Sequence, residues 1–141
     1  MIKFERILVP MDGSDCAELI LPSVEKFSAD FKSSIVLLQV VYAHAFPGVN
    51  LSKAETEAVK RGEDYLKKIE DQLKAKGFTV DSHVRYGDAA EEILEHASQK
   101  DIDMIAMTTH GRSGVKRFLL GSVVSKILRH SPKPVFLVRC S

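Results

Sequence analysis

Short apolar runs alternate with helical segments along this chain, and this alternation restricts the fold more than any other feature. Each run suits a strand buried on both faces of a sheet, because such strands are almost continuously apolar. Right-handed crossovers between parallel strands place helices on both faces of the sheet. The pattern therefore predicts a mostly parallel sheet covered by helices, with strands at residues 6–10, 34–42, 78–86, 102–108 and 133–139.

The intervening segments carry apolar residues at helical spacing. Ser14 can cap the first helix, whose apolar side runs to Phe31, and Pro22 inside it should kink or locally unpair it. A long amphipathic helix is expected from Ser52 to Lys76, before Gly77, and shorter helices are expected after Gly87-Asp88 and from residue 122 to 129. Residues 78–86 alternate in polarity, which places that strand near a sheet edge.

Length and composition favour a single domain over residues 1–141 and exclude several classes of protein. The net charge of +1 argues against a general nucleic-acid-binding surface, and the apolar runs are too short to span a bilayer. The N-terminus lacks the layout of a signal peptide. Cys16 and Cys140 lie far apart in sequence and suggest neither a metal site nor a disulfide scaffold. A reducing cytoplasm is the expected location.

The loop after the fourth expected strand carries the strongest functional signal. It holds Gly111 and Gly114 and ends at Gly121-Ser122, where a helix should begin. Unpaired amides and the positive end of a helix favour an anion, so the loop predicts a phosphate site. Its basic residues could pair with phosphate or form a solvated face, and they are Arg112, Lys116 and Arg117.

Other residues near this loop have two interpretations each. Asp12, after the first strand, could bind a ribose, assist a metal or only cap the following turn. Ser122 could hold phosphate or serve as an ordinary N-cap, and His110 fits loop packing better than general base catalysis. The chain has no P-loop, dinucleotide-binding, zinc-protease or nucleophile-elbow motif. We therefore expect no catalytic residues and no metal ligands.

The chain resembles the universal stress protein family over essentially all 141 positions, as a small single-domain A-type member. The resemblance implies an open, mostly parallel five-stranded sheet that is Rossmann-like, with strand order 3-2-1-4-5. The segments that carry the resemblance are Ile7-Leu-Val-Pro-Met-Asp-Gly-Ser14, Val36-Leu-Leu-Gln-Val40, Gly87, Thr109-His-Gly-Arg-Ser-Gly114, Leu120-Gly-Ser-Val123 and Pro132-Lys-Pro-Val-Phe-Leu-Val-Arg139.

ATP-binding members of that family carry the motif Gly-x-x-Gly, nine residues, then Gly-Ser or Gly-Thr. Gly111 and Gly121-Ser122 fit the last two elements, whereas Thr108 replaces the first glycine. Val124 is a second departure, because some ATP binders supply a hydroxyl there. By resemblance, Asp12 would contact the ribose and Val40 the adenine. The full expected nucleotide site is Pro10, Met11, Asp12, Val40, Met107, Thr108, His110, Gly111, Gly121, Ser122 and Val123.

The resemblance also implies a homodimer in which the fifth strands pair, through Val135, Phe136, Leu137 and Val138. The expected function is a cytoplasmic binding module for ATP, with or without Mg²⁺, that acts as a regulatory ligand in a stress response and is hydrolysed slowly at most. Three alternatives stay open: a structural or signalling dimer that binds no ATP, a slow ATPase, and a binder of AMP or cyclic AMP. No nucleic acid and no membrane is expected as a partner.

Overall fold

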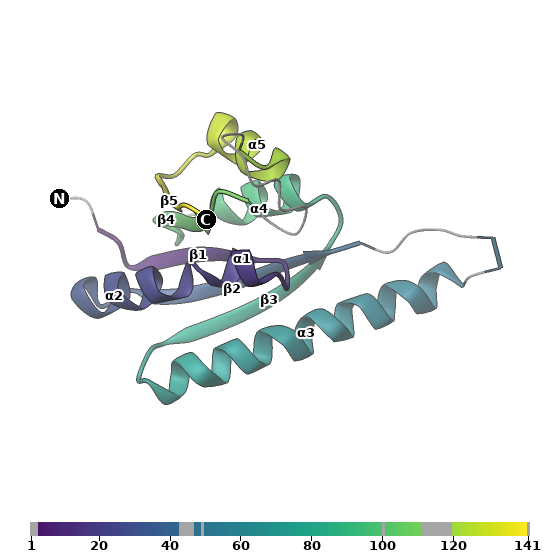
Figure 1. The fold of residues 1–141 in the computed structure, drawn as a ribbon, viewed down its shortest axis with the longest axis horizontal. Coiled ribbons are helices and arrows are strands. Elements are labelled where there is room, and N and C mark those ends of the chain that lie inside the picture. The colour runs from purple at the N-terminus through teal and green to yellow at the C-terminus, as the bar shows by residue number, and fades with distance from the viewer. Residues whose placement is uncertain (1–2, 43–46, 49, 100, 111–119, 141) are drawn as a thin grey trace.

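The computed structural model describes residues 3–42, 47–48, 50–99, 101–110 and 120–140, and a sheet of parallel strands forms its centre (Figure 1). The strand order is β3-β2-β1-β4-β5, which the family resemblance implied. The order reverses direction between β1 and β4, and in such sheets ligands bind beyond the carboxyl ends of the strands at this point. The strands are β1 (Arg6–Met11), β2 (Ser34–Val41), β3 (Val80–Tyr86), β4 (Met104–Thr108) and β5 (Val135–Val138).

Helices cover both faces of the sheet, as the alternation predicts (Figure 1). One face packs against α1 (Asp15–Glu18), α2 (Leu21–Phe31) and α3 (Leu51–Ala75). The other packs against α4 (Ala89–Ala97) and α5 (Ser122–His130). Among the described residues, every helix is too short or too polar to span a bilayer.

Pro22 divides the segment after β1 into two helices, which confirms the predicted interruption. Proline has no N–H to donate to the carbonyl of Glu18, four residues earlier, so a continuous helix would lose a hydrogen bond there. The structure ends α1 at Glu18 and begins α2 at Leu21, with Pro22 in the first turn of α2, where no such donor is needed. The short helix α1 is thereby left beside the carboxyl end of β1.

The central strands are buried on both faces, which explains their continuous apolar runs. Ile7 and Val9 of β1 pack on the α1–α3 side, whereas Leu8 packs on the α4–α5 side, and all three are 0% exposed. β3 lies at one edge of the sheet and alternates in burial, as its sequence predicts. β5 forms the opposite edge, where Phe136 is 39% exposed.

A carboxylate fixes β1 beside β4 at their amino ends. Asp103 Oδ2 accepts hydrogen bonds from the backbone N–H of Glu5 at 2.8 Å and of Arg6 at 3.0 Å. The N–H of Asp103 in turn donates to the carbonyl of Arg6 at 2.9 Å. These bonds set the register of the two strands whose opposite ends carry the candidate site.

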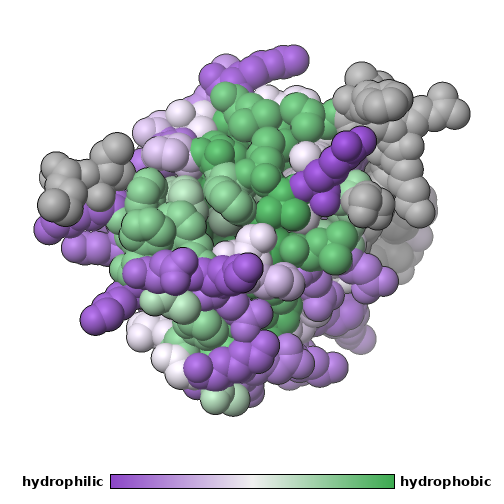
Figure 2. Space-filling model, turned by 60° about the vertical axis from the view of Figure 1, so that its left-hand side comes forward, coloured by the Kyte–Doolittle hydropathy of each residue, from purple (hydrophilic) through white to green (hydrophobic). Residues whose placement is uncertain are grey.

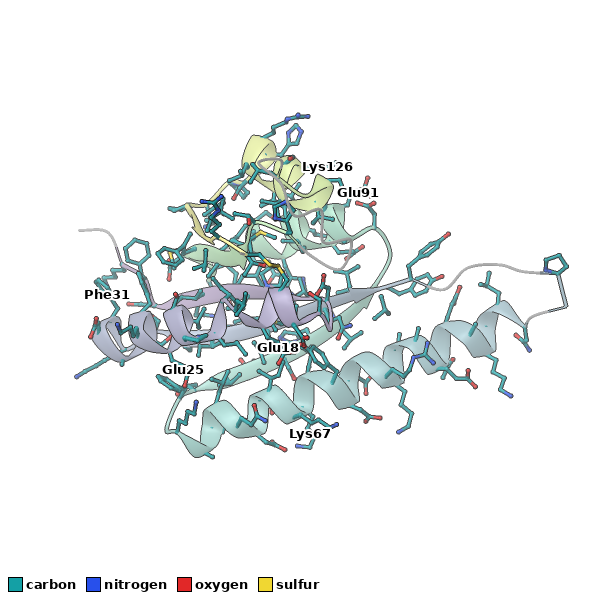
Figure 3. The ribbon with its side chains drawn as sticks, in the orientation of Figure 1. Glu18, Glu25, Phe31, Lys67, Glu91 and Lys126 are labelled. Atoms are coloured by element: carbon teal, nitrogen blue, oxygen red, sulfur yellow. A yellow bond between two sulfur atoms is a disulfide. The ribbon has the colours of Figure 1, made fainter. Side chains whose placement is uncertain are left out.

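Cys16 and Cys140 form a disulfide, which their separation in sequence did not suggest (Figure 3). Their Cα atoms are 5.7 Å apart although 124 positions separate them in sequence. Cys16 lies in α1, just beyond the carboxyl end of β1, and Cys140 lies just beyond the carboxyl end of β5. In a parallel sheet all carboxyl ends share one edge, so distance along the chain says little about distance in space.

Candidate functional site

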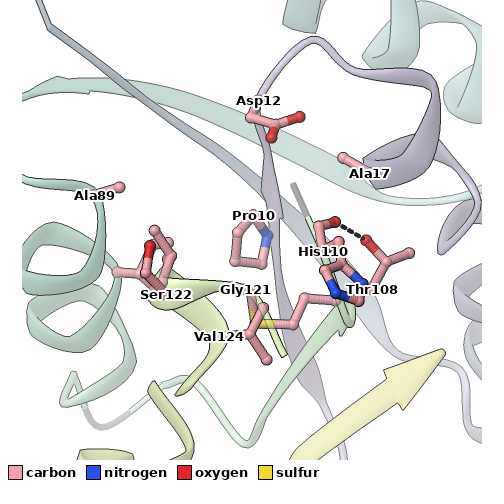
Figure 4. A pocket seen from close by; sticks show the side chains of 12 residues that line it. Pro10, Asp12, Ala17, Ala89, Thr108, His110, Gly121, Ser122 and Val124 are labelled. Atoms are coloured by element: carbon pink, nitrogen blue, oxygen red, sulfur yellow. Dashed lines mark hydrogen bonds between the residues drawn. The ribbon is translucent and has the colours of Figure 1, made fainter. Parts of the chain in front are cut away.

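A cavity of about 310 Å³ opens at the carboxyl edge of the sheet, where β1 and β4 meet the N-termini of α4 and α5 (Figure 4). Its wall is mostly apolar, with a carboxylate, a hydroxyl and a helix N-terminus added. The lining residues are Pro10, Asp12, Ala17, Ala89, Ile93, Met107, Thr108, His110, Gly121, Ser122, Val123 and Val124.

Most of the expected nucleotide site therefore surrounds one cavity, but two of the described expected residues, Met11 and Val40, do not line it. Met11 is 3% exposed and belongs to the core on the α1–α3 side, since its side chain points to the opposite face from Pro10. Val40 lines a neighbouring hollow of about 520 Å³, which Asp12 also lines. Gly111 lies outside the described residues, as do Gly114 and the loop bases Arg112, Lys116 and Arg117.

Asp12 holds the turn after β1 and lines both hollows. Its Oδ1 accepts hydrogen bonds from the N–H of Ser14 at 2.9 Å and from the Ser14 hydroxyl. The Ser14 hydroxyl oxygen accepts from the N–H of Ala17 at 3.1 Å, which confirms Ser14 as the helix cap. Gly13 between them has a φ of 83°, a left-handed conformation that glycine adopts without strain. The structural interpretation of Asp12 thus holds, and its place on the cavity wall adds a carboxylate to the site.

Thr108 forms part of the wall without closing the cavity. It is 4% exposed, and its hydroxyl donates to the carbonyl oxygen of His110 at 2.8 Å (Figure 4). His110 is itself buried, and its Nδ1 lies 3.1 Å from the Thr109 hydroxyl. These contacts agree with a loop-packing role for His110.

The N-terminus of α5 reaches the cavity through its first residues. Gly121 is the N-cap and has no side chain to bond the first turn, so the alternative that Ser122 caps this helix is wrong. The first N–H groups of any α-helix have no acceptor within the helix. Those of Ser122, Val123 and Val124 are therefore available to an anion that the helix dipole also attracts.

The neighbouring hollow lies on the α3 side of the sheet and is more polar. Gln39, Tyr42, Arg61 and Tyr65 line it together with Asp12. Burial, followed by the carboxylates of Glu18 and Asp12, raises the pKa of the Tyr65 hydroxyl above its ordinary value of 10.0. Tyr65 therefore stays protonated and can donate a hydrogen bond at neutral pH.

Four wall residues of the main cavity were not among the expected contacts. Ala17 and Ile93 lie at helical spacing with other apolar residues, which indicates core, and Ala89 was not singled out from the sequence. Val124 was identified only as a departure from the family motif. Ala89 begins the helix that follows Gly87, so its place after a strand end was the available signal. Among the described residues, no three metal-ligating side chains converge on one point.

Comparison with known proteins identifies a family, its curated relatives and solved structures to which this chain is similar. Residues 3–139 match the model of the universal stress protein family. A universal stress protein of Methanothermobacter thermautotrophicus is 32% identical and aligns over 96% of each chain. The solved structure of MJ0577, a universal stress protein of Methanocaldococcus jannaschii, is 26% identical, with a TM-score of 0.86 over 99% of each chain.

Two solved structures of the same fold contain adenine nucleotides. One is a universal stress protein in complex with cAMP, 20% identical, with a TM-score of 0.65 over 99% of each chain. The other is a universal stress protein family member of Arabidopsis thaliana with AMP bound, 16% identical, with a TM-score of 0.71 over 97% of this chain and 92% of that one. At these identities the likeness concerns the fold alone.

Proposed function

Because the chain belongs to the universal stress protein family, we propose that its cavity binds an adenine nucleotide, with ATP as a regulatory ligand in a stress response. One observation carries this proposal: a carboxylate and a helix N-terminus face the same apolar cavity at the reversal point of the sheet. That combination suits a ligand with sugar hydroxyls, an apolar ring and an anionic end.

The chemistry assigns a role to each part of the wall. The Asp12 carboxylate accepts hydrogen bonds from the ribose hydroxyls, and the amides of Ser122 and Val123 donate to phosphate oxygens. The apolar side chains of Pro10 and Met107 contact the sugar and the base. Gly111, by the family motif, would add a backbone amide beside the phosphates.

Size supports a ligand that extends past the main cavity. A volume of about 310 Å³ is at the small end for ligand sites, which span roughly 300–1,000 Å³. The adjoining hollow of about 520 Å³ shares Asp12 and includes Val40. A nucleotide bound with its ribose at Asp12 can direct the phosphates toward α5 and the base toward Val40.

AMP and cyclic AMP are the alternative ligands, since structures of the same fold contain them. Adenosine contacts would be shared by all three nucleotides, so discrimination must come from the phosphate end. The motif departure at Thr108 acts on that same end, where its β-branched side chain limits the approach of phosphate to the backbone. Mg²⁺, if it binds, would then be held mainly by the phosphates and water.

We also propose a cytoplasmic homodimer that forms through β5. An unpaired edge strand that is apolar is an aggregation hazard unless another chain covers it. Phe136 on this edge is 39% exposed. On one face, the molecule carries an area of apolar residues (Figure 2). The residues that would pair are Val135, Phe136, Leu137 and Val138. A dimer without ATP is the second candidate function, favoured by Thr108 and Val124.

Binding without fast turnover fits the described residues best. His110 is buried and engaged with its own loop, and Asp12 Oδ1 accepts hydrogen bonds from Ser14, so both side chains already hold the cavity wall in place. We therefore expect hydrolysis to be slow at most. Steady turnover that falls by orders of magnitude in Asp12→Asn would support the ATPase alternative instead.

Isothermal titration with ATP, AMP and cyclic AMP, each with and without Mg²⁺, tests the proposal. Asp12→Asn keeps an oxygen that can accept from Ser14 but removes the negative charge, and it should weaken binding by about tenfold, near 1.4 kcal/mol. Ser14→Ala is the matched control, because it weakens the same turn while it leaves the carboxylate in place. Absence of heat at millimolar concentrations of every nucleotide would refute the proposal.

A further inference from the structure

The Cys16–Cys140 disulfide joins two segments beside the candidate nucleotide cavity. Cys16 lies between Ser14, which bonds Asp12, and Ala17, which lines the cavity. The Cys140 N–H donates to the Thr109 hydroxyl oxygen at 3.1 Å, which connects the end of β5 to the residues that leave β4. One covalent bond thus ties α1 to the end of β5, and a hydrogen bond ties that end to the residues after β4.

A short contact extends this connection into the cavity wall. The Cys16 sulfur lies 3.2 Å from the carbonyl oxygen of His110, and the Thr108 hydroxyl donates to the same oxygen. The N–H of Thr109 donates to the carbonyl of Val138 at 3.0 Å. The disulfide therefore lies at the junction of α1, β4 and β5, beside Ala17 and Thr108, which line the cavity.

We propose that Cys16 and Cys140 form a reversible redox modification site that takes low-molecular-weight disulfides of the glutathione class. The two Cα atoms, 5.7 Å apart, are within the range of about 4.4–6.8 Å that a disulfide spans, so the bond needs no rearrangement of the backbone. Both residues are partly exposed, which gives a small thiol or disulfide access. In a reducing compartment, disulfides are usually transient and redox-sensing.

The exchange proceeds in two displacements. One cysteine thiolate attacks a sulfur of the small disulfide, which forms a mixed disulfide and releases one small thiolate. The second cysteine thiolate then attacks the protein sulfur of that mixed disulfide, which closes the Cys16–Cys140 bond and releases the second small thiolate. The protein loses two electrons and two protons, the small disulfide gains both as two thiols, and excess thiol reverses the reaction.

The redox state sets how firmly the cavity wall is held. In the oxidised protein the bond restrains α1 against the ends of β4 and β5, whereas in the reduced protein only non-covalent contacts do so. When the cavity wall is already ordered before binding, less conformational entropy is lost on binding, so the oxidised protein binds nucleotide more tightly. This consequence for affinity rests on the nucleotide function proposed above, but the redox chemistry does not.

The redox site is tested on the full chain by mass spectrometry after incubation in glutathione mixtures, with thiols blocked by alkylation. The chain has two cysteines, so the outcome is readable: oxidised glutathione should yield an intramolecular disulfide, and reduced glutathione should restore two alkylated thiols. Cys140→Ser should instead stop at a stable mixed disulfide on Cys16. Resistance to both reagents, or a disulfide between two chains on a non-reducing gel, would overturn the proposal.

The effect on the wall is tested by amide hydrogen exchange without nucleotide. The N–H groups of Cys140 and Ala17 should exchange at least about tenfold more slowly in the oxidised protein. The double variant Cys16→Ser, Cys140→Ser should exchange at the reduced rate under both conditions. Equal rates in the two forms of the wild type would refute the restraint.

Nucleotide titration of both forms then measures the coupling. ATP should bind about fivefold or more tightly to the oxidised protein, and the double serine variant should show no such difference. Equal affinities would refute the coupling. If neither form binds any nucleotide, the proposed function fails, and the mass and exchange results still decide whether the redox site exists.

Discussion

Asp103 offers a sharp test of how the two site-bearing strands are held together. Its Oδ2 accepts backbone N–H groups of Glu5 and Arg6 at 2.8 and 3.0 Å. Hydrogen bonds to a charged group contribute about 1.5–3 kcal/mol each. Because one bond is exposed and the other only partly buried, water replaces much of what Asp103→Ala removes. We expect a loss of about 2 kcal/mol in the free energy of unfolding.

The expected loss converts to a thermal shift through the entropy of unfolding. At about 2.1 cal/mol/K per residue, a chain of 141 residues has about 0.3 kcal/mol/K, so 2 kcal/mol lowers Tm by about 7 °C. Asp103→Asn retains an acceptor oxygen without the charge and should lose about half as much. Urea unfolding at a fixed redox state gives both free energies, with an unchanged dependence on urea concentration.

A neighbouring carboxylate provides the control. Asp101 Oδ2 lies 3.2 Å from Nε of Arg6 and makes an ion pair with a side chain, not with the backbone. Exposed ion pairs of this kind contribute about 0–1 kcal/mol to the free energy of unfolding. Asp101→Asn should therefore lower that free energy by much less than Asp103→Ala does. If Asp103→Ala lowers the free energy of unfolding by no more than Asp101→Asn does, the hydrogen bonds from the backbone to Asp103 do not hold β1 beside β4. Nucleotide binding should be unchanged in all three variants, because these residues lie at the opposite edge of the sheet.

Three further predictions follow from contacts of the described residues. Ala89→Trp places a large ring in the main cavity and should lower nucleotide affinity at least about tenfold while the fold persists, as titration and circular dichroism would show. The Ser82 hydroxyl, 2.6 Å away, is the first cause that lowers the pKa of Glu70 below its ordinary value of 4.5. The ionised Glu70 carboxylate therefore raises the free energy of unfolding at pH values above about 4.5. Glu70→Gln should lower that free energy at pH 7, and by progressively less as the pH falls below about 4.5. Urea unfolding at several pH values measures the difference. A Cβ at Gly62 would lie 3.3 Å from Val84, so Gly62→Leu should destabilise by about 1–3 kcal/mol.

Matched variants separate these effects from general damage. Ala89→Ser leaves the cavity open and should bind as the wild type does. Gly62→Ala adds one carbon and should cost far less than the leucine, because only its Cβ has to fit beside Val84. A pH-independent effect of Glu70→Gln would contradict the assignment of its lowered pKa.

The sheet could be predicted from the sequence because the burial of each strand determines a pattern of apolar residues within that strand. β1 and β2 have apolar residues at successive positions because helices cover both of their faces. In β3, apolar and polar residues alternate, as expected for an edge strand with one covered face. Pro22 was equally readable, because the missing N–H acts within one turn of helix. These signals lie within a few residues of the structure that they specify.

The site was predictable only where a strand end or a glycine marked it. Asp12 and Gly121 follow strand ends or begin a helix, and both line the cavity. Met11 shows the limit, since adjacent residues of a strand point to opposite faces and the family likeness alone does not separate their roles. The Cys16–Cys140 contact left no local signal, because the crossovers that lead from β1 to β5 bring the two residues together.

Asp12 lines two hollows, one bordered by α4 and α5 and the other by α3, and this limits what its substitution can report. A change there alters both hollows together, so loss of ligand in an Asp12 variant does not locate the ligand on either side. Residues that belong to one hollow alone resolve the two: Ala89 on the α4 side and Arg61 on the α3 side. A bound molecule that is sensitive to both must straddle the sheet margin at this single acidic side chain.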